Sequence, residues 1–511
     1  FLLSTRLFTL RSRAKANYAQ LDDVLLPFCC NSNSSQNYAL MSYYEEMNES
    51  KVVQIRNAIV GFACGFTAGI LLFDRSTLRI TFSHAEGLHY TNAQVEIIYV
   101  CGIFGLGIGL PVAFLQRFIK PYYINLIACL GSITGFLLLW TATLYKGWFW
   151  DKAGVLALYN FIAGHSIGYA YYTSLWVGMS SFPSTKNVFS WIHHLPLVCS
   201  ALLLSIIVTD VRYFLPVQLI ITITASLLAI VLLRTPSTIE APVRVTGEAR
   251  QFTLPAYEYP ASDTESIADS EDSGIGERRA QMIRGSMSRW TRIWHAFWES
   301  RPILLTFALA TSSSLNLAHE PVISAEVRFV VCAVGATLGL FAAHLPGLSR
   351  TNFLLVVLTI RAVFLAIGVT ERNNSDVSML LWCSGGLIEG IFWTLTPVMN
   401  SDVSMLLWCS GGLIEGIFWT LTPVMVYELR GRKRLTLLWS LAILCFVILT
   451  ALQSAIILLL FDTQSTIAVC RADKCPLLIT QLRFALTLCA IISTMWLRDH
   501  QPAESANENS S

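Results

Sequence analysis

Residues 94–116, QVEIIYVCGIFGLGIGLPVAFLQ, and residues 122–144, YYINLIACLGSITGFLLLWTATL, are two long apolar stretches joined by the short basic segment RFIKP. A helix needs about 20 mostly apolar residues to cross the hydrocarbon core of a bilayer, because lipid offers the backbone no hydrogen-bond partner. Each stretch meets that length. The pair therefore predicts two membrane-spanning helices joined by a tight turn.

The same pattern recurs along the whole chain of 511 residues. Thirteen apolar segments lie at about 57–73, 94–116, 122–144, 153–180, 188–209, 213–233, 302–319, 324–345, 352–370, 376–399, 402–425, 435–461 and 476–497. Hydrophobic residues make up 54% of the chain and charged residues only 13%, which excludes an ordinary water-soluble enzyme. The composition predicts an integral, multi-pass membrane protein in contact with the lipid bilayer. A net charge of +2 gives no reason to expect a nucleic-acid partner.

Two of these segments are identical, because NSDVSMLLWCSGGLIEGIFWTLTPVM occupies residues 374–399 and recurs unchanged at 400–425. An exact tandem duplication of 26 residues is typical of an exon counted twice. Keeping both copies would also place the basic loop with Arg430, Arg432 and Arg434 outside, against the positive-inside tendency. We therefore expect an all-α polytopic protein with a 12-helix (6+6) fold, and a 13th hydrophobic segment created by the duplication. Sequence alone leaves open whether both copies exist in the protein.

The other regions are polar. We expect cytosolic tails at 1–51 and 498–511, and residues 1–40, which precede the first methionine, have the character of a truncated or misassigned start. The gap at 234–301 contains YEYPASDTESIADSEDSGIGERR, which predicts a disordered cytosolic linker between a bundle at 52–233 and a bundle at 302–497. The linker ends in SRWTRIWHAFWES (288–300), where tryptophans four residues apart favour a short amphipathic helix at the membrane surface.

Most of the 13 cysteines lie in apolar segments, where they behave as small hydrophobes. Cys470 and Cys475 fall in an expected outer loop, and a disulfide between them is one interpretation. A zinc site is the weaker interpretation, because the pair lacks two further ligands. The chain has no HExxH, Walker or paired CxxC motif. We therefore expect no cofactor, no metal and no enzymatic activity.

The two halves carry related patterns of small residues. Gly164 and Gly168 lie in the fourth span, and Gly412 and Gly416 lie in the span of corresponding rank in the second half. The second and eighth spans also end alike, in GLPVAFL (109–115) and GLFAAHL (339–345). Small residues four positions apart let neighbouring helices approach closely. The patterns indicate two related bundles, as in many transporters.

Several stretches resemble a known family. Residues 65–118, GFTAGILLFDRSTLRITFSHAEGLHYTNAQVEIIYVCGIFGLGIGLPVAFLQRF, are similar to the opening helix pair of nodulin-like and monocarboxylate-porter-like members of the major facilitator superfamily. SFPSTKN (181–187) stands where these proteins have an NFP loop, and YELRGRKR (427–434) stands where they have an SELFG loop. The resemblance covers about residues 55–497. The chain departs from the family pattern at Gln116, where an acid is usual, and at Ile119, where a glycine is usual.

The resemblance implies a secondary active transporter of a small organic solute, such as a monocarboxylate or a related metabolite, with both termini in the cytosol. It implies alternating access to one central cavity, which is lined by the first, fourth, seventh and tenth spans. Protons as well as solute are expected to bind in this cavity. The substrate, the direction of coupling, the oligomeric state and the choice between plasma membrane and endolysosomal or vacuolar membrane are not encoded in any motif. The alternative interpretation is a non-transporting membrane receptor or scaffold with a transporter-like fold. An intramembrane enzyme and a channel are further alternatives.

Ionisable groups inside a span are costly, so each is a candidate functional residue. His165 lies in the middle of the fourth span, Arg361 in the ninth, and Glu415 in the tenth, with Glu389 at the same place in the repeated copy. His165 and Glu415 are candidates for proton coupling, since both can titrate near neutral pH when half-buried. An interhelical hydrogen bond is the alternative for His165, and an ion pair with Arg361 is the alternative for Glu415.

Further candidates lie near the helix ends. Asp74, Arg75 and Arg79 follow the first span and could bind an anionic solute or form a solvated mouth. The seventh span ends in TSSSLNLAHEP, which predicts a partly unwound helix that faces water and contacts solute. Glu326 and Arg328 open the eighth span, where monocarboxylate porters resemble this chain in having an acid and an arginine. The solute and proton candidates from these three segments are Asp74, Arg75, Arg79, Ser313, Asn316, His319, Glu326 and Arg328. His193 and His194, beside Trp191, are interpreted as interfacial belt residues at the start of the fifth span.

Overall fold

The computed structural model describes residues 34–73, 75–83, 88–182, 184–207, 213–234, 289–314, 322–342, 349–371, 403–461 and 475–499. The chain divides into two units, Phe1–Val53 and Gln54–Ser511. The first copy of the repeated segment, at 374–399, and residues 235–288 of the expected linker lie outside the described residues. The thirteenth segment and the disordered linker therefore stay predictions.

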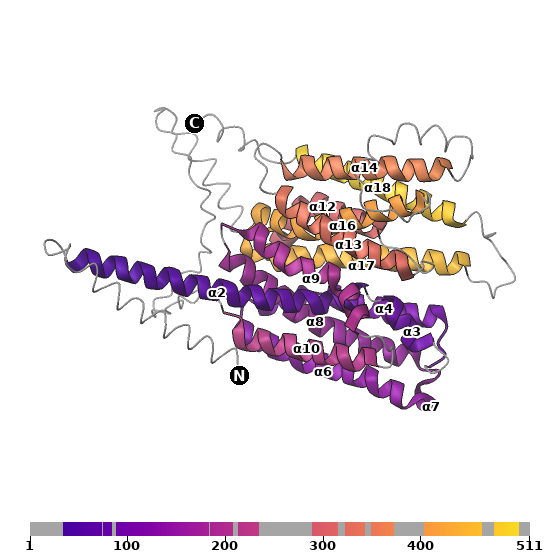
Figure 1. Ribbon diagram of the computed structural model, residues 1–511, viewed down its shortest axis with the longest axis horizontal. Helices are drawn as coiled ribbons and strands as arrows, with labels where there is room; N and C mark the ends of the chain where they lie inside the picture. The colour runs from indigo at the N-terminus through magenta and orange to yellow at the C-terminus, as the bar shows by residue number, and fades with distance from the viewer. Residues whose placement is uncertain are drawn as a thin grey trace. The chain divides into compact units, whose positions relative to one another are not determined.

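The described residues of the first half form α-helices joined by short turns (Figure 1). Its helices are α2 (Ser34–Phe73), α3 (Arg75–Ser83), α4 (Asn92–Gly107), α5 (Leu110–Leu115), α6 (Pro121–Leu144), α7 (Lys146–Phe149), α8 (Ala153–Ser181), α9 (Lys186–Ile207) and α10 (Phe214–Leu232). The helix that contains the first span thus begins at Ser34, well before the expected bundle boundary at residue 52. The second expected span is two helices, α4 and α5, because Pro111 in the first turn of α5 has no backbone N–H to continue α4.

The second half is also helical where it is described. Its helices are α12 (Arg289–Ser314), α13 (Val322–Ala342), α14 (Arg350–Glu371), α16 (Val403–Arg430), α17 (Arg432–Phe461) and α18 (Cys475–Asp499). The amphipathic helix expected at 288–300 is not a separate element, because α12 runs from Arg289 through Pro302 into the seventh span. Contacts just before Pro302 hold this part of α12 against α16: Arg430 Nη1 lies 2.5 Å from Glu299, and Arg430 Nε donates to Ser300 Oγ at 3.0 Å.

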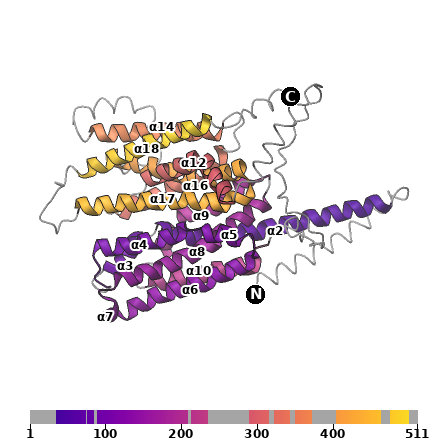
Figure 2. The same ribbon diagram turned by 180° about the vertical axis from the view of Figure 1, so that it is seen from behind.

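The two halves pack in the same way. The contacts α4·α8, α6·α8 and α6·α10 within the first bundle correspond by rank to α13·α16, α14·α16 and α14·α18 within the second. Between the bundles, α9 packs against α13 and α16, and α17 packs against α4 and α8. Figure 2 shows the orange α17 beside the purple α4. The two sets of contacts between the bundles are therefore related to each other by an approximate twofold axis.

Glycines permit the closest of these approaches. A Cβ atom on Gly164 of α8 would overlap the carbonyl oxygen of Gly102 on α4. In the second half, a Cβ atom on Gly416 of α16 would overlap the carbonyl oxygen of Cys332 on α13. Gly168 and Gly412 are also buried. The glycine patterns noted in the sequence thus lie at corresponding helix contacts in the two bundles.

The outer helices present apolar faces. Ile220 on α10 is 62% exposed, Ile360 on α14 is 50% exposed, and Ile492 on α18 is 65% exposed. Six described helices are long and apolar enough to cross a membrane by length and composition: Lys51–Phe73, Asn92–Leu115, Pro121–Leu144, Phe214–Leu232, Arg434–Ile456 and Thr480–Arg498. These exposed apolar faces are the surfaces that contact lipid.

Candidate functional site

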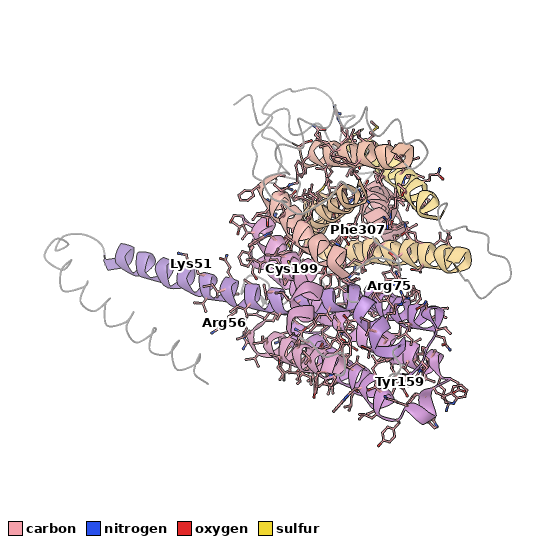
Figure 3. The ribbon with its side chains drawn as sticks, turned by 45° about the vertical axis from the view of Figure 1, so that its right-hand side comes forward. Lys51, Arg56, Arg75, Tyr159, Cys199 and Phe307 are labelled. Carbon is pink, nitrogen blue, oxygen red and sulfur yellow. The ribbon has the colours of Figure 1, made fainter. Side chains whose placement is uncertain are left out.

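A cluster of aromatic and histidine side chains lies where the two bundles meet. The central cluster consists of Phe73, Tyr171, His193, His194, Phe307, Trp419 and Trp439. Its members come from α2, α8, α9, α12, α16 and α17, so both bundles contribute. Figure 3 shows the side chains around this contact, with Phe307 labelled on the orange α12 and Cys199 labelled on α9.

Trp419 is the centre of the cluster. Its ring centroid lies 5.2 Å from that of Phe307, 5.7 Å from that of Trp439 and 6.1 Å from that of His194. Trp419, Phe307 and Trp439 are each 0% exposed. The first, fourth, seventh and tenth spans do meet here, as the resemblance implies, but their side chains fill the space at this level. The expectation of a water-filled cavity at this position is wrong for this conformation, because the aromatic rings pack against one another.

Hydrogen bonds connect the bundles within the cluster. Trp439 Nε1 of α17 donates to the hydroxyl of Tyr171 on α8 at 3.1 Å. On the other side of the twofold axis, Ser190 Oγ of α9 donates to the carbonyl oxygen of Thr420 on α16 at 2.6 Å. Both bonds are buried. Each joins a helix of one bundle to the fourth or tenth span of the other.

A second layer of contacts lies toward the loop ends that carry Gln116, Lys186 and Arg432. Thr436 Oγ1 donates to Gln116 Oε1 at 2.7 Å. Gln116, which replaces the acid usual in the resembled family, therefore takes part in a neutral hydrogen bond across the interface. Since successive spans alternate in direction, these loop ends share one side of the membrane, which the basic loop at 430–434 predicts to be the cytosolic side.

Two cation–aromatic contacts also cross the interface in this layer. Lys186 Nζ, at the start of α9, lies 4.6 Å from the ring centroid of Tyr427 on α16. Arg432 Cζ, at the start of α17, lies 4.6 Å from the ring centroid of Trp176 on α8. A cation over an aromatic face is attracted by the ring quadrupole. The two contacts correspond to each other in the approximate twofold arrangement of the bundles.

His165, a predicted proton-coupling residue, is half-buried on the side of α8 that faces α4. Its Nδ1 lies 3.3 Å from the carbonyl oxygen of Gly105, and its ring stacks on Phe161 and meets the edge of Tyr169. A carbonyl only accepts, so Nδ1 is the protonated nitrogen in this hydrogen bond. These contacts match the alternative of an interhelical hydrogen bond, and the proton-coupling role of His165 stays a prediction.

Glu415 and Arg361 are both buried in the second bundle, at 1% and 2% exposure. They lie on α16 and α14, which contact each other. Glu415 precedes Trp419 by four residues and so shares its helical face. The ion pair between Glu415 and Arg361 stays a prediction, as does the role of Glu415 in proton coupling.

Arg75, predicted to bind an anionic solute or to line a solvated mouth, has a partner. It forms an ion pair with Glu96 of α4 and lies 5.8 Å from the ring centroid of Tyr99. The Glu96 side chain is only 7% exposed, and the sequence analysis did not single it out. A carboxylate that compensates Arg75 reduces the attraction of this arginine for an anionic solute. Arg79, one turn further along α3, is half-buried.

The other predicted site residues are not placed by the structure. Asp74, Asn316, His319, Glu389 and Cys470 lie outside the described residues. Ser313, Glu326, Arg328 and Cys475 lie in described helices, but their side chains lie outside the described part. The disulfide between Cys470 and Cys475 and the unwound end of the seventh span stay predictions. The neighbouring Ser312 is 0% exposed and does not face water.

The interpretation of His193 and His194 as interfacial belt residues is wrong. Both are 0% exposed, because helices of both bundles pack against this part of α9: His193 contacts α2 and α8, and His194 contacts Trp419 of α16 and Trp439 of α17. Ser190 lies one turn before His194, and Pro196 follows, so this stretch of α9 carries several polar or irregular positions in an apolar helix. That concentration of polar side chains was the available signal for an internal site.

A small cavity lies inside the first bundle. Its volume is about 10 Å³, enough for about one water molecule, and its polar lining residues are Tyr99, Asn160 and Gln218. Asn160 Nδ2 donates to the carbonyl oxygen of Ile98 at 2.9 Å. The cavity is too small for an organic solute and is separate from the central cluster.

No protein-family model matches the chain, and no curated protein matches its sequence. Solved structures with similar folds include the partially occluded inward-open xylose transporter XylE from E. coli, at 10% identity and a TM-score of 0.51, covering 89% of this chain and 99% of that one. A D-xylose-proton symporter is similar at 10% identity and a TM-score of 0.55, covering 88% and 98%. XylE bound to 6-bromo-6-deoxy-D-glucose is similar at 10% identity and a TM-score of 0.54, covering 89% and 97%.

These similarities extend over almost the full length of the similar chains, with the helices in the same arrangement. They confirm the all-α prediction and the two-bundle architecture. The chain is an integral, multi-pass membrane protein with the major facilitator fold.

Proposed function

We propose that the protein is a secondary active transporter that moves a small organic solute by alternating access. The observation that carries the proposal is the twofold-related contact between bundles, in which α9 packs against α13 and α16 while α17 packs against α4 and α8. Two related bundles that meet along such a contact can rock against each other and expose a site between them to one side at a time. The major facilitator fold supports this reading.

We further propose a monocarboxylate or a related metabolite as the solute, in line with the nodulin-like and monocarboxylate-porter-like resemblance. The indole N–H of Trp419 is buried and has no hydrogen-bond acceptor in the part of the chain that the structure describes. An orphaned donor between the bundles can bind a carboxylate or hydroxyl oxygen when the interface parts. The structurally similar proteins are named as xylose transporters, so a pentose is the second solute class.

Proton coupling is part of the proposal. His165 in the fourth span and Glu415 in the tenth span are titratable groups at corresponding ranks in the two bundles. Glu415 is buried on the same helical face as Trp419, which supports a role near the solute.

A non-transporting receptor or scaffold is the second candidate function. The observation that favours it is the dry packing of the central cluster, in which six of the seven side chains are 0% exposed. A transporter must pass through a conformation in which this packing separates, whereas a scaffold need not.

Uptake into proteoliposomes tests the transport proposal. With an outside pH of 5.5 and an inside pH of 7.5, we expect the protein to accumulate radiolabelled L-lactate above protein-free liposomes, and a protonophore to collapse the accumulation. D-xylose is the second probe. If the protein accumulates D-xylose but not L-lactate, the proposed solute is a pentose and not a monocarboxylate. No uptake of either probe would contradict both solute classes and favour the scaffold.

The coupling candidates are tested in the same assay with His165→Ala and Glu415→Gln. We expect both variants to lose the dependence of uptake on the pH gradient. Lys146→Ala is the matched control, because Lys146 is exposed in the structure. If both variants respond to pH as the parent does, these two residues do not couple protons to transport.

A further inference from the structure

His193 and His194 form a buried pair of imidazoles at the interface between the bundles. Their ring centroids lie 4.8 Å apart, and both side chains are 0% exposed. Tyr171 contacts both rings, at 4.7 Å from His193 and 6.1 Å from His194 between centroids. The pair therefore lies beside the hydroxyl that receives the inter-bundle hydrogen bond from Trp439.

The hydrogen-bond partners of His194 fix its protonation state. Nδ1 lies 2.8 Å from the carbonyl oxygen of Ser190, which can only accept, so Nδ1 carries a proton. In the neutral ring, Nε2 then carries no proton and has a lone pair, to which the hydroxyl of Tyr171 donates at 2.9 Å. The indole N–H of Trp439 donates in turn to Tyr171. The chain of donors thus runs from Trp439 through Tyr171 to His194 and on to the backbone of Ser190.

The hydrogen-bond partners of His193 likewise show which of its ring nitrogens carries the proton. The hydroxyl of Ser174 donates to the carbonyl oxygen of Tyr171 at 2.9 Å, so Ser174 Oγ accepts from His193 Nε2 at 3.1 Å. Nδ1 of His193 then carries a lone pair, and it is buried without a hydrogen-bond partner among the described residues. An unpartnered basic nitrogen inside the protein is a position at which a proton can bind.

We infer that the His193–His194 pair is a proton-binding site, and that a proton bound there favours separation of the two bundles. Its use in solute movement rests on the proposed transport function. The pair holds one proton, because two charged rings at this distance would repel each other in a buried site.

The link between the proton and the interface follows from the donor chain. Nε2 of His194 is the second basic nitrogen of the pair, and it is the one connected through Tyr171 to the inter-bundle hydrogen bond. A proton on Nε2 of His194 turns this acceptor into a donor, and the hydroxyl of Tyr171 loses its acceptor. Tyr171 can then accept from both His194 and Trp439, but its own O–H is left without the acceptor that it had. A buried polar group without a partner destabilises the structure around it. Protonation therefore destabilises the closed interface around Tyr171, and acid conditions favour the separated interface.

Titratable groups near the middle of the surrounding helices include Cys64 of α2, Tyr171 and Tyr172 of α8, and Glu415 of α16. From α13, Thr337 accepts from Trp191, and from α17, Trp439 contacts His194; neither side chain titrates in the physiological range. Glu415 is the one carboxylate among these groups, and its variant is therefore included in the test.

Accessibility of the interface tests the inference without knowledge of the solute. Ser440 of α17 is 1% exposed and lies against Gly109 and Tyr172 of the other bundle. A Ser440→Cys variant in lipid nanodiscs is labelled with a maleimide at pH 8 and at pH 5, and mass spectrometry quantifies the labelled peptide. Each rate is divided by the rate in the denatured protein at the same pH, which removes the intrinsic effect of pH on thiol reactivity.

We expect the normalised labelling rate to rise at least about fivefold from pH 8 to pH 5. With His193→Gln and His194→Gln together, the rate should not change with pH. Tyr171→Phe keeps both imidazoles but removes the hydroxyl between His194 and Trp439, so its labelling should be high at both values. If the double histidine variant does not fold, Tyr171→Phe still tests whether the pH response depends on the hydroxyl between His194 and Trp439.

A pH response that persists in the double histidine variant, or in Tyr171→Phe, would overturn the inference. So would a response that disappears with His165→Gln or Glu415→Gln while the double histidine variant retains it. The transport proposal fails separately. Absence of solute uptake with an intact pH response removes the transporter and leaves the proton site, whereas uptake with a flat pH response removes only the proton site.

Discussion

Gly164→Leu and Gly416→Leu are expected to abolish the folded, monodisperse form of the protein. Each glycine faces a backbone carbonyl oxygen on the partner helix, Gly102 for Gly164 and Cys332 for Gly416. Backbone atoms cannot rotate away as side chains do, so a larger residue must push the helices apart. Overpacking in a well-packed interior costs about 1–3 kcal/mol even where side chains can adjust. Fluorescence-detected size-exclusion chromatography after detergent extraction measures the folded fraction.

A graded alanine series on α8 provides the matched control. A Cβ at Gly164 would overlap the carbonyl of Gly102, a Cβ at Gly168 would lie 3.2 Å from the carbonyl oxygen of Leu106, and a Cβ at Gly154 meets nothing within 4 Å. We expect Gly164→Ala to lower the melting temperature by about 3–10 °C, Gly168→Ala to lower it less, and Gly154→Ala to leave it unchanged. Equal melting temperatures for Gly164→Ala and Gly154→Ala would show that α4 and α8 do not approach as described.

Removing both cations of the interface is expected to have the second largest effect. Lys186→Gln removes the contact with Tyr427, and Arg432→Gln removes the contact with Trp176. A cation–aromatic contact contributes about 0.5–2 kcal/mol, so each loss shifts the balance toward a separated interface by about 2- to 30-fold. We expect the labelling rate of Ser440→Cys at pH 8 to rise about fivefold for each single variant and about 25-fold for the double variant.

Substitutions of Tyr427 separate the contribution of the cation–aromatic contact from the effect of losing the charge of Lys186. Tyr427→Phe keeps the ring face under Lys186 and should leave the labelling rate close to that of the parent. Tyr427→Leu removes the ring but not the lysine, and it should match Lys186→Gln. If Tyr427→Phe and Tyr427→Leu give the same labelling rate, the ring face does not stabilise the closed interface.

The length of the apolar spans and the spacing of the glycines were enough to predict most of the fold. The apolar runs placed helices correctly because a membrane-spanning helix has a required length, and Gly164 and Gly416 indicated close contacts because small residues permit them. Helix ends were less predictable. The helix of the seventh span begins at Arg289 rather than near residue 302, and contacts of Glu299 and Ser300 with Arg430 hold the segment just before Pro302 against α16.

The central cluster was harder to predict. His193 and His194 were interpreted as interfacial because they lie near the start of a span, whereas their burial depends on the helices of both bundles that pack against α9. The partnership of Trp439 with Tyr171 joins residues 268 positions apart, on helices of different bundles. No local pattern reports such a contact, because it depends on how the bundles pack. Arg75 was identified as a candidate, but its partner Glu96 was not, for the same reason.

The central claim is that the two bundles must part at their interface for solute to move. A disulfide across the interface tests it, placed at Gln116→Cys and Thr436→Cys, whose native side chains are hydrogen-bonded at 2.7 Å. The control pair, Asn57→Cys and Ser181→Cys, lies within the first bundle, where the native side chains are hydrogen-bonded at 2.7 Å.

The measurement is uptake of L-lactate, or of D-xylose if that is the probe the parent accumulates, before oxidation, after oxidation and after reduction. The account predicts that oxidation reduces uptake by the 116–436 pair to the level of protein-free liposomes, that reduction restores it, and that the control pair transports throughout. Uptake at the parent rate by the fully cross-linked 116–436 protein would contradict the account.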